Sequence, residues 1–307
     1  MIELIHGDCL EEMKNIPDGS IDAIITDPPY GTIKSAALDG WGENKTEWDD
    51  IIPHNEMLNE CNRVLRVNGT LILFSQDPYT GKLMTNAHGN IPFSYRMTWL
   101  KDHFANALIA KKAPVNYTED ICVFFKKYDT LNQHPLRDRV KHIFEKINKQ
   151  KKQLFLEMGH QGVCHFMRFD TMQFGLCTEK TYNQLIDMYA INELDDFIQY
   201  REMEEINQRF SRRFSRIFNL LDGKKYKSNV LKHKKDYLGL HPTQKPVSLM
   251  EDLISTYTNE GNNVLDFTMG SGTTMVACKN LNRNGIGIEL NKEYFEIAKN
   301  RIDDILL

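Results

Sequence analysis

The chain of 307 residues lacks the patterns that mark membrane, secreted and repeat proteins. No apolar run approaches the roughly 20 residues needed to cross a bilayer, so we expect no membrane-spanning helix. Residues 1–8 include acids and no long apolar stretch, so we also expect no signal peptide. Internal repeats and low-complexity tracts are absent as well. These absences favour a globular protein without a membrane partner.

Cysteines are few and show no pairing pattern. The six cysteines include no C-x-x-C pair, which is typical of reduced thiols, and so we expect a cytoplasmic protein. His160, Cys164, His165 and Cys177 lie close together in the sequence, but their spacing matches no zinc-finger pattern. We therefore expect no metal at these residues.

Charge is distributed unevenly along the chain. Hydrophobic residues make up 41% and charged residues 26%, as in ordinary soluble proteins, and the net formal charge is −4. Residues 126–152 contain nine Lys and Arg against three acids, and residues 209–235 contain ten against one. Two basic blocks on an acidic body are typical of a surface that binds phosphates. Two solvated helix faces would explain them equally well.

Short apolar runs rich in β-branched residues predict strands at both ends of the chain. Helical stretches at 55–65 and 246–258 separate several of them, as a parallel, doubly wound sheet requires. From about 130 to 230 the strand pattern gives way to charged amphipathic helices, which predicts an inserted domain. The predicted strands are 2–5, 21–26, 70–75, 96–100, 121–125, 263–267 and 285–289.

The segment TDPPYGT, residues 26–32, follows the second predicted strand directly. Its two prolines lock φ and lack an N–H, so they stop the strand and leave a stiff loop. In this loop the Asp27 carboxylate and the proline carbonyls are acceptors beside the flat ring of Tyr30. Such an array suits a planar ligand that carries an amino group. An ordinary proline turn is the alternative, because short motifs also occur by chance.

Residues 263–290 read as a strand, a glycine turn, a helix and a second strand. Gly270 and Gly272 allow a tight turn, and Glu289 ends the second strand, where an acid can bind two ribose hydroxyls. The spacing is not G-x-G-x-x-G, because no third glycine follows Gly272. A nucleoside site without phosphates is therefore favoured over a dinucleotide site. A plain strand-to-helix turn with a solvated acid is the alternative.

Together, these segments resemble the DNA amino-methyltransferases, which use S-adenosylmethionine. Residues 27–30 match the catalytic D-P-P-Y, and residues 266–274 match the cofactor motif of this family. The segment HPTQKPVSLMEDLI, from His241, matches the part that lies beside the methionine moiety, and Asp8 matches the residue at the adenine edge. The catalytic motif precedes the cofactor motif, which resembles the circularly permuted β class.

The resemblance implies an α/β fold, a doubly wound, mostly parallel, seven-stranded Rossmann-like methyltransferase sheet. It implies a catalytic half at 1–129, a helical target-recognition insertion at 130–235 and a cofactor-binding half at 236–307. The catalytic residues that it implies are Asp27, Pro28, Pro29 and Tyr30. The cofactor-binding residues that it implies are Asp8, His241, Thr243, Gln244, Lys245, Asp266, Thr268, Gly270, Ser271, Gly272, Thr273 and Glu289.

The implied reaction explains the proline loop. An exocyclic amino group is a poor nucleophile, because its lone pair is delocalised into the ring. The Asp27 carboxylate and the Pro28 carbonyl can accept its two N–H groups and point the lone pair at the donor methyl. Tyr30 would stack on the base, which must be flipped out of the duplex. Asp at the first motif position favours adenine N6; cytosine N4 and a catalytically silent DNA-binding relative are the alternatives.

The expected partner is double-stranded DNA, and a second copy of the chain and a cognate restriction endonuclease are further candidates. Two positions depart from the family pattern: Phe267-Thr268 stands where Pro-Phe is usual, and Thr118-Glu119 stands where His-Glu is frequent. Thr178 is expected to cap a helix whose apolar stripe either packs in a core or enters the major groove. The cations assigned to the DNA backbone are Arg137, Arg139, Lys141, Arg212, Arg213 and Arg216.

Overall fold

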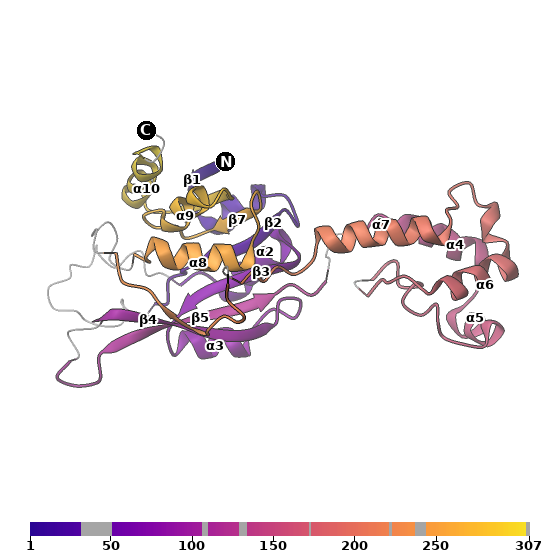
Figure 1. Ribbon diagram of the computed structural model, residues 1–307, viewed down its shortest axis with the longest axis horizontal. Coiled ribbons are helices and arrows are strands. Elements are labelled where there is room, and N and C mark those ends of the chain that lie inside the picture. Colours follow the sequence, from indigo (N-terminus) through magenta and orange to yellow (C-terminus); the bar gives the residue numbers. More distant parts are fainter. Residues whose placement is uncertain are drawn as a thin grey trace. The chain divides into compact units, whose positions relative to one another are not determined.

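The computed structural model describes residues 1–31, 51–105, 110–128, 134–171, 173–220, 223–236 and 244–304. The chain divides into two compact units, shown in Figure 1. Met1–Lys127 and Arg216–Leu307 form the sheet unit, and Tyr128–Ser215 form the helical unit. The segment 216–235, which the sequence assigned to the insertion, therefore belongs with the sheet. Within the described ranges, no helix is long and apolar enough to cross a membrane.

The sheet unit contains an eight-stranded sheet in the order β1-β8-β7-β2-β3-β5-β4-β6. Neighbouring strands run parallel except where β5 pairs with β3 and β4. This arrangement confirms the α/β class and the mostly parallel, doubly wound sheet. The strands are β1 (Ile2–His6), β2 (Ile21–Thr26), β3 (Leu65–Ser75), β4 (Phe93–Ala105), β5 (Asn116–Phe125), β6 (Val230–Lys232), β7 (Asn263–Asp266) and β8 (Asn284–Glu289).

The sheet differs from the sequence prediction by one extra strand and by the greater length of β3, β4 and β5, which begin at Leu65, Phe93 and Asn116 instead of residues 70, 96 and 121. The edge strand β6 was not predicted, so the sheet has eight strands rather than seven; its three residues are too few to show an alternating pattern. β3 already pairs with β2 at Leu65 and continues through Asn68-Gly69, where the register of this pairing shifts. Asn68 has a φ of 59°, and a Cβ on Gly69 would lie 2.9 Å from the Asp22 carbonyl oxygen. Glycine is therefore required at this position.

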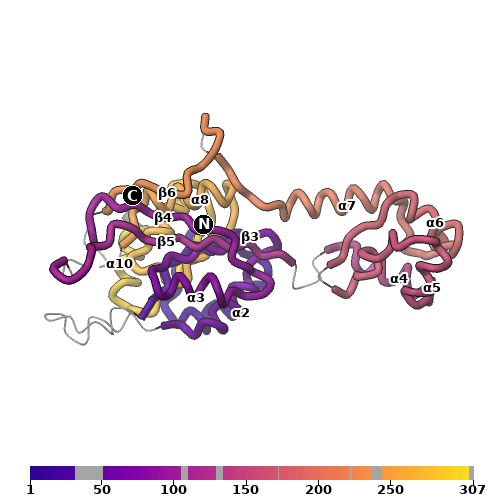
Figure 2. The backbone as a smooth tube through the Cα atoms, turned by 90° about the horizontal axis from the view of Figure 1, so that it is seen from below, coloured from indigo at the N-terminus to yellow at the C-terminus, as the bar shows by residue number. Residues whose placement is uncertain are grey.

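Helices cover both faces of the sheet, because successive strand residues point to opposite sides. Ile24 packs in a core with α2 (His54–Val64) and α3 (Tyr79–Thr85). Ile25 packs in a second core with α8 (Val247–Tyr257), α9 (Thr273–Asn280) and α10 (Lys292–Asp304). Figure 2 shows α2 and α3 on the side of the sheet away from α8. Two short elements, α1 (Cys9–Glu12) and the 3-10 turn η1 (Met13–Asn15), follow β1.

The helical unit has a hydrophobic core of its own. It contains α4 (Arg137–Ile147), α5 (Lys151–Met158), α6 (Glu179–Tyr189), the 3-10 turn η5 (Ile191–Glu193) and α7 (Tyr200–Arg213). Thr178 caps α6 as predicted, since its hydroxyl accepts the Thr181 N–H at 3.3 Å. Tyr182 and Leu185 of α6 are fully buried in this core. The apolar stripe of α6 therefore packs inside the unit rather than facing a DNA groove.

The chain leaves and re-enters the sheet unit at neighbouring positions. Phe125 ends β5, and Arg216 is the first residue of the returning segment. The guanidinium carbon of Arg216 lies 4.0 Å from the centroid of the Phe125 ring, which is a cation–π contact. This contact joins the two ends of the inserted segment on the sheet unit itself.

Candidate active site

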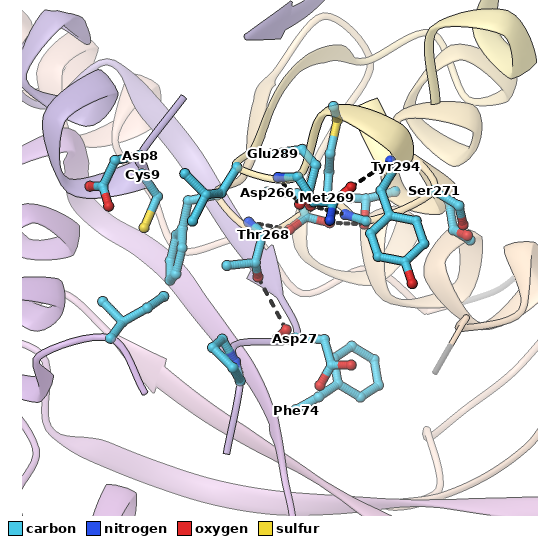
Figure 3. A pocket seen from close by; sticks show the side chains of 18 of the residues that line it. Asp8, Cys9, Asp27, Phe74, Asp266, Thr268, Met269, Ser271, Glu289 and Tyr294 are labelled. Atoms are coloured by element: carbon cyan, nitrogen blue, oxygen red, sulfur yellow. Dashed lines mark hydrogen bonds between the residues drawn. The ribbon is translucent and has the colours of Figure 1, made fainter. Parts of the chain in front are cut away.

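Three acids end three neighbouring parallel strands at one edge of the sheet. Asp27 follows β2, Asp266 ends β7 and Glu289 ends β8. In doubly wound sheets, ligands bind outside the carboxyl ends of the strands. A cavity of about 580 Å³ opens there, and Figure 3 shows its lining. The predicted residues that line it are Asp8, Asp27, Pro29, Gln244, Lys245, Asp266, Thr268, Gly270, Ser271, Thr273 and Glu289.

The other predicted residues fall outside this lining. Pro28 and Tyr30 lie in the same loop as Asp27, and Gly272 is the residue just before α9, with a φ of 77°. A Cβ on Gly272 would lie 2.9 Å from the Cβ of Ala298, so only glycine fits this turn. His241 and Thr243 lie outside the described residues.

Glu289 is fixed by the backbone of two turns. One carboxylate oxygen accepts the Gly270 N–H at 2.9 Å, and the other accepts the Asn291 N–H at 2.8 Å. Burial raises the pKa of Glu289 above its ordinary value. Each carboxylate oxygen has a second lone pair, so the side chain can still accept two hydroxyl groups from a ligand.

Asp266 ties the predicted cofactor motif to the end of β2. Its carboxylate accepts the hydroxyls of Thr26 at 2.7 Å and Thr274 at 2.5 Å, and the Thr268 N–H at 3.2 Å. Burial raises the pKa of Asp266 to about 6. The Thr268 hydroxyl in turn donates to the Asp27 carbonyl at 3.1 Å, a bond drawn in Figure 3. The two motifs are therefore joined directly through side-chain hydrogen bonds.

The Asp27 carboxylate is held by two donors. One oxygen accepts the Tyr30 hydroxyl, and the other accepts the ammonium of Lys245. The Tyr30 ring stacks on Tyr79 with centroids 5.5 Å apart, and Phe74 lies next to Asp27 at this end of the cavity (Figure 3). Asp8 and Cys9 lie at another side of the same cavity (Figure 3). The cavity can therefore hold one ligand between an acceptor-rich catalytic loop and a separate acidic side chain.

Lys245 lies beside the catalytic motif, although the sequence placed it with the cofactor residues. Its ammonium bonds to Asp27 and lies 2.7 Å from Glu119, whose other oxygen lies 2.8 Å from the ammonium of Lys101. Sequence reasoning missed Lys101 and gave Glu119 no role. No local signal could have identified this group, because Lys245 and Asp27 are 218 residues apart in the sequence.

The cavity wall also explains one departure from the family pattern. Phe267 is buried and lines the cavity, so the aromatic ring stays at the wall although it comes one position early. Both polar atoms of the Gln244 side chain are buried, with no hydrogen-bond partner among the described residues. A buried amide without partners is costly, so a polar ligand in this cavity would satisfy it.

The predicted DNA-backbone cations differ in exposure. Arg137 is only 6% exposed and donates to the carbonyls of Phe169 and Thr171 at 2.7 and 2.6 Å, so it stabilises the helical unit. Arg139 is partly exposed, 4.0 Å from Asp196. Lys126, counted in the first basic block, is 1% exposed and donates to two carbonyls of the sheet unit. The exposed members of the predicted set are Lys141, Arg212, Arg213 and Arg216.

A metal site is not found in the described ranges. No group of three or more His, Cys, Asp or Glu side chains there is arranged to hold a metal ion. His160 instead lies 2.9 Å from the Gln184 side chain and accepts the Gly162 N–H.

Comparison with known proteins identifies the family. A family model described as DNA methylase, which covers N6 and N4 enzymes, matches residues 21–300. The chain belongs to this DNA methylase family. The Type II methyltransferase M2.DpnII of Streptococcus pneumoniae is 44% identical over 314 residues, covering 98% of this chain and 89% of the relative. M2.LlaDCHI of Lactococcus lactis subsp. cremoris is 43% identical, covering 98% of this chain and 88% of the relative.

More distant DNA methylases match nearly the whole chain. The DNA adenine methyltransferase YhdJ of Escherichia coli K12 is 26% identical, covering 98% of this chain and 82% of the relative. The solved structure of the M1.HpyAVI–SAM complex aligns with a TM-score of 0.55 at 24% identity and covers 98% of this chain and all of that one. The predicted membership of the S-adenosylmethionine-dependent DNA amino-methyltransferases is therefore confirmed, and the protein is a DNA methyltransferase.

Proposed function

We propose that this DNA methylase transfers the methyl group of S-adenosylmethionine to the N6 amino group of an adenine flipped out of duplex DNA. The observation that carries this proposal is the Asp27 carboxylate, which lines the cavity next to the Pro28-Pro29 turn. Asp27 is the first residue of the D-P-P-Y motif. An aspartate at this position resembles the adenine enzymes of the family. The relative YhdJ, named a DNA adenine methyltransferase, supports the same target.

The catalytic loop orients the amino group of the target base. Each Asp27 oxygen accepts one bond from the described residues and has a second lone pair left, and the Pro28 carbonyl, past the end of β2, is a further acceptor. Two acceptors can bind both N–H groups of the amine and align its lone pair, which lowers the barrier through orientation. The acidic surroundings also stabilise the positive charge that develops on the methylated nitrogen. Thr268 holds the loop through the Asp27 carbonyl.

The cofactor side of the cavity fits S-adenosylmethionine. Bound there, this group supplies an activated methyl on a sulfonium. Glu289 would accept the ribose hydroxyls and Asp8 would face the adenine edge. The Gln244 amide, which has no partner among the described residues, would bind a polar part of the ligand. A volume of about 580 Å³ lies within the usual range for cofactor sites.

We assign phosphate contacts to exposed cations and target recognition to the helical unit. Lys141, Arg212, Arg213 and Arg216 are exposed and can reach phosphates. Arg139 and Lys141 are weaker candidates than the three arginines, because Asp196 lies 4.0 Å from Arg139 and Glu145 lies 3.8 Å from Lys141. Target recognition is proposed for the helical unit, because specificity needs side chains in a groove in addition to phosphate contacts.

A methyl-transfer assay tests the proposal. The purified protein is incubated with tritium-labelled S-adenosylmethionine and duplex DNA, and the digested nucleosides are separated by chromatography. Label in N6-methyladenine is the expected result. Label in N4-methylcytosine would move the target to cytosine, and unlabelled DNA would indicate a catalytically silent relative. Sequencing the same DNA with modified-base detection gives the recognition site.

The relatives suggest a biological partner. M2.DpnII and M2.LlaDCHI are named Type II methyltransferases, and we infer that a cognate restriction endonuclease shares the recognition site of this enzyme. DNA methylated by the protein should then resist that endonuclease, while unmethylated DNA is cut. Light scattering of the purified protein tests the predicted second copy of the chain.

A further inference from the structure

Four charged side chains form a buried chain behind the catalytic loop. The Lys101 ammonium of β4 lies 2.8 Å from one oxygen of Glu119 on β5. The other oxygen of Glu119 lies 2.7 Å from the Lys245 ammonium, just before α8, and Lys245 also bonds to Asp27. The side chains of Lys101, Glu119 and Lys245 are only 5%, 7% and 8% exposed. Lysines this deeply buried need paired partners, and here two lysines alternate with two carboxylates.

We propose that Lys245 is a positioning residue for methyl transfer, whose ammonium, shared between Glu119 and Asp27, keeps Asp27 ionised and fixes its orientation at the cavity. The proposal rests on the proposed catalytic role of Asp27. It assigns Lys245 to the catalytic side of the site instead of the methionine moiety of the cofactor.

The physical reason is the proximity of two buried carboxylates. Burial raises the pKa of Asp27, the Lys245 charge opposes this, and the Glu119 charge adds to it, so the pKa remains above its ordinary value. For Glu119, burial acts in the same direction, but Lys245 and Lys101 together hold its pKa below the ordinary value. Without the ammonium between them, one carboxyl would take up a proton. A protonated Asp27 loses acceptor capacity for the amino group of the base.

No other described cation forms an ion pair with Asp27. Tyr30 donates a neutral hydrogen bond to it, and the carboxylate of Asp266 on β7 adds a weak repulsion. Tyr79, behind Tyr30, is neutral at ordinary pH like any tyrosine, and burial raises its pKa further.

Further groups face Lys245 itself. The Lys245 ammonium lies 5.0 Å from the centroid of the Phe74 ring. This cation–π contact adds to the two carboxylates that hold the ammonium in place. Burial lowers the pKa of Lys235, and the charges of Lys101 and Lys245 lower it further, although the Glu119 charge opposes them. This repulsion leaves Lys235 poorly suited to replace Lys245 beside Asp27.

The first experiment measures kcat against pH, with DNA and S-adenosylmethionine saturating, for the full-length enzyme and for Lys245→Met. In the wild type we expect a flat profile around neutral pH. In Lys245→Met we expect kcat at neutral pH to fall at least about tenfold and to recover about tenfold per pH unit as Asp27 ionises. The dissociation constant of S-adenosylmethionine, measured by calorimetry without DNA, should stay within about threefold. A flat profile with weakened cofactor binding would overturn the proposal and place Lys245 on the cofactor.

Two further variants separate positioning from a general loss of structure. Adding Glu119→Gln to Lys245→Met removes the second carboxylate. The rise of kcat with pH should then shift back toward lower pH, and part of kcat at neutral pH should be restored. A purely structural role predicts additional damage instead. The matched control is Lys227→Met, which breaks another largely buried ion pair of the same unit, 2.5 Å from Asp252, and should leave the profile flat. Lys245→Arg keeps the cation and should keep the flat profile.

A direct readout needs neither cofactor nor DNA. Carbon-13 NMR of labelled aspartate carboxyls, with the Asp27 signal assigned through Asp27→Asn, should show a higher titration midpoint for Asp27 in Lys245→Met than in the wild type. An unchanged midpoint would refute the ion-pair role. If the wild-type enzyme methylates no DNA, the proposed function fails, whereas this titration still decides whether Lys245 keeps Asp27 ionised.

Discussion

Replacing Glu289 with glutamine tests the cofactor site with the smallest change of shape. The carboxylate now accepts one N–H on each oxygen, from Gly270 at 2.9 Å and Asn291 at 2.8 Å. Glutamine turns one acceptor into a donor, so one of these N–H groups loses its partner. The negative charge that would bind the ribose hydroxyls is also lost.

The expected loss follows from these bonds. Hydrogen bonds to a charged group contribute about 1.5–3 kcal/mol, and a weakened ribose pair should cost about 2–3 kcal/mol of cofactor binding. That corresponds to a roughly 30- to 150-fold higher dissociation constant. The unsatisfied N–H should also lower the free energy of unfolding by about 1–3 kcal/mol.

Calorimetry with S-adenosylmethionine and without DNA measures the affinity, and urea unfolding measures the stability. Glu293→Gln is the matched control, because Glu293 is exposed on α10 and does not line the cavity. Since burial raises the pKa of Glu289, wild-type affinity should fall as pH drops through that raised value, while the Glu289→Gln affinity stays flat. A Glu289→Gln dissociation constant within about threefold of the wild type would refute the ribose assignment.

Three further predictions concern catalysis, DNA and stability. Asp27→Ala should abolish methyl transfer in the tritium assay while calorimetry shows nearly unchanged cofactor binding; full activity would remove Asp27 from catalysis. Neutralising Arg212, Arg213 and Arg216 together should reduce the slope of log affinity against log salt by up to about 2.7, and an unchanged slope would contradict phosphate contact. Because burial raises the pKa of Asp266 from 3.8 to about 6, its stabilising contribution is full below about pH 4 and is lost as pH rises through about 6. Asp266→Asn should remove about 3 kcal/mol of that pH dependence in urea unfolding, and identical curves would disprove it.

Local sequence patterns predicted the elements whose signals are local. The run 21–26 became β2 with the same limits, because β-branched residues favour a strand and the Pro28-Pro29 pair ends it. Glu289 ends β8, and the glycine turn opens α9, as the spacing indicated. The edge strand β6 escaped detection because three residues within a basic segment carry no periodic signal.

Tertiary contacts determined the roles of residues that local sequence patterns could not predict. Lys245 bonds to Asp27 only because the segment before α8 packs beside the end of β2. Arg137 looked like a surface cation, yet the helical unit uses its guanidinium to hold two loop carbonyls. Charge counts alone cannot distinguish a phosphate-binding arginine from one that satisfies buried acceptors, because both need the same side chain.

The contact between Phe125 and Arg216 affects how the protein can evolve. For the sheet unit, the whole segment 128–215 is one inserted loop whose flanking residues already meet. The entropy cost of closing such a loop rises only logarithmically, by about 0.6 kcal/mol for each doubling of its length. The same sheet can therefore carry inserts of very different size with little change in its own stability. If target recognition lies in the insert, a new DNA specificity can be acquired by exchanging this segment while Asp27 and Glu289 stay in place.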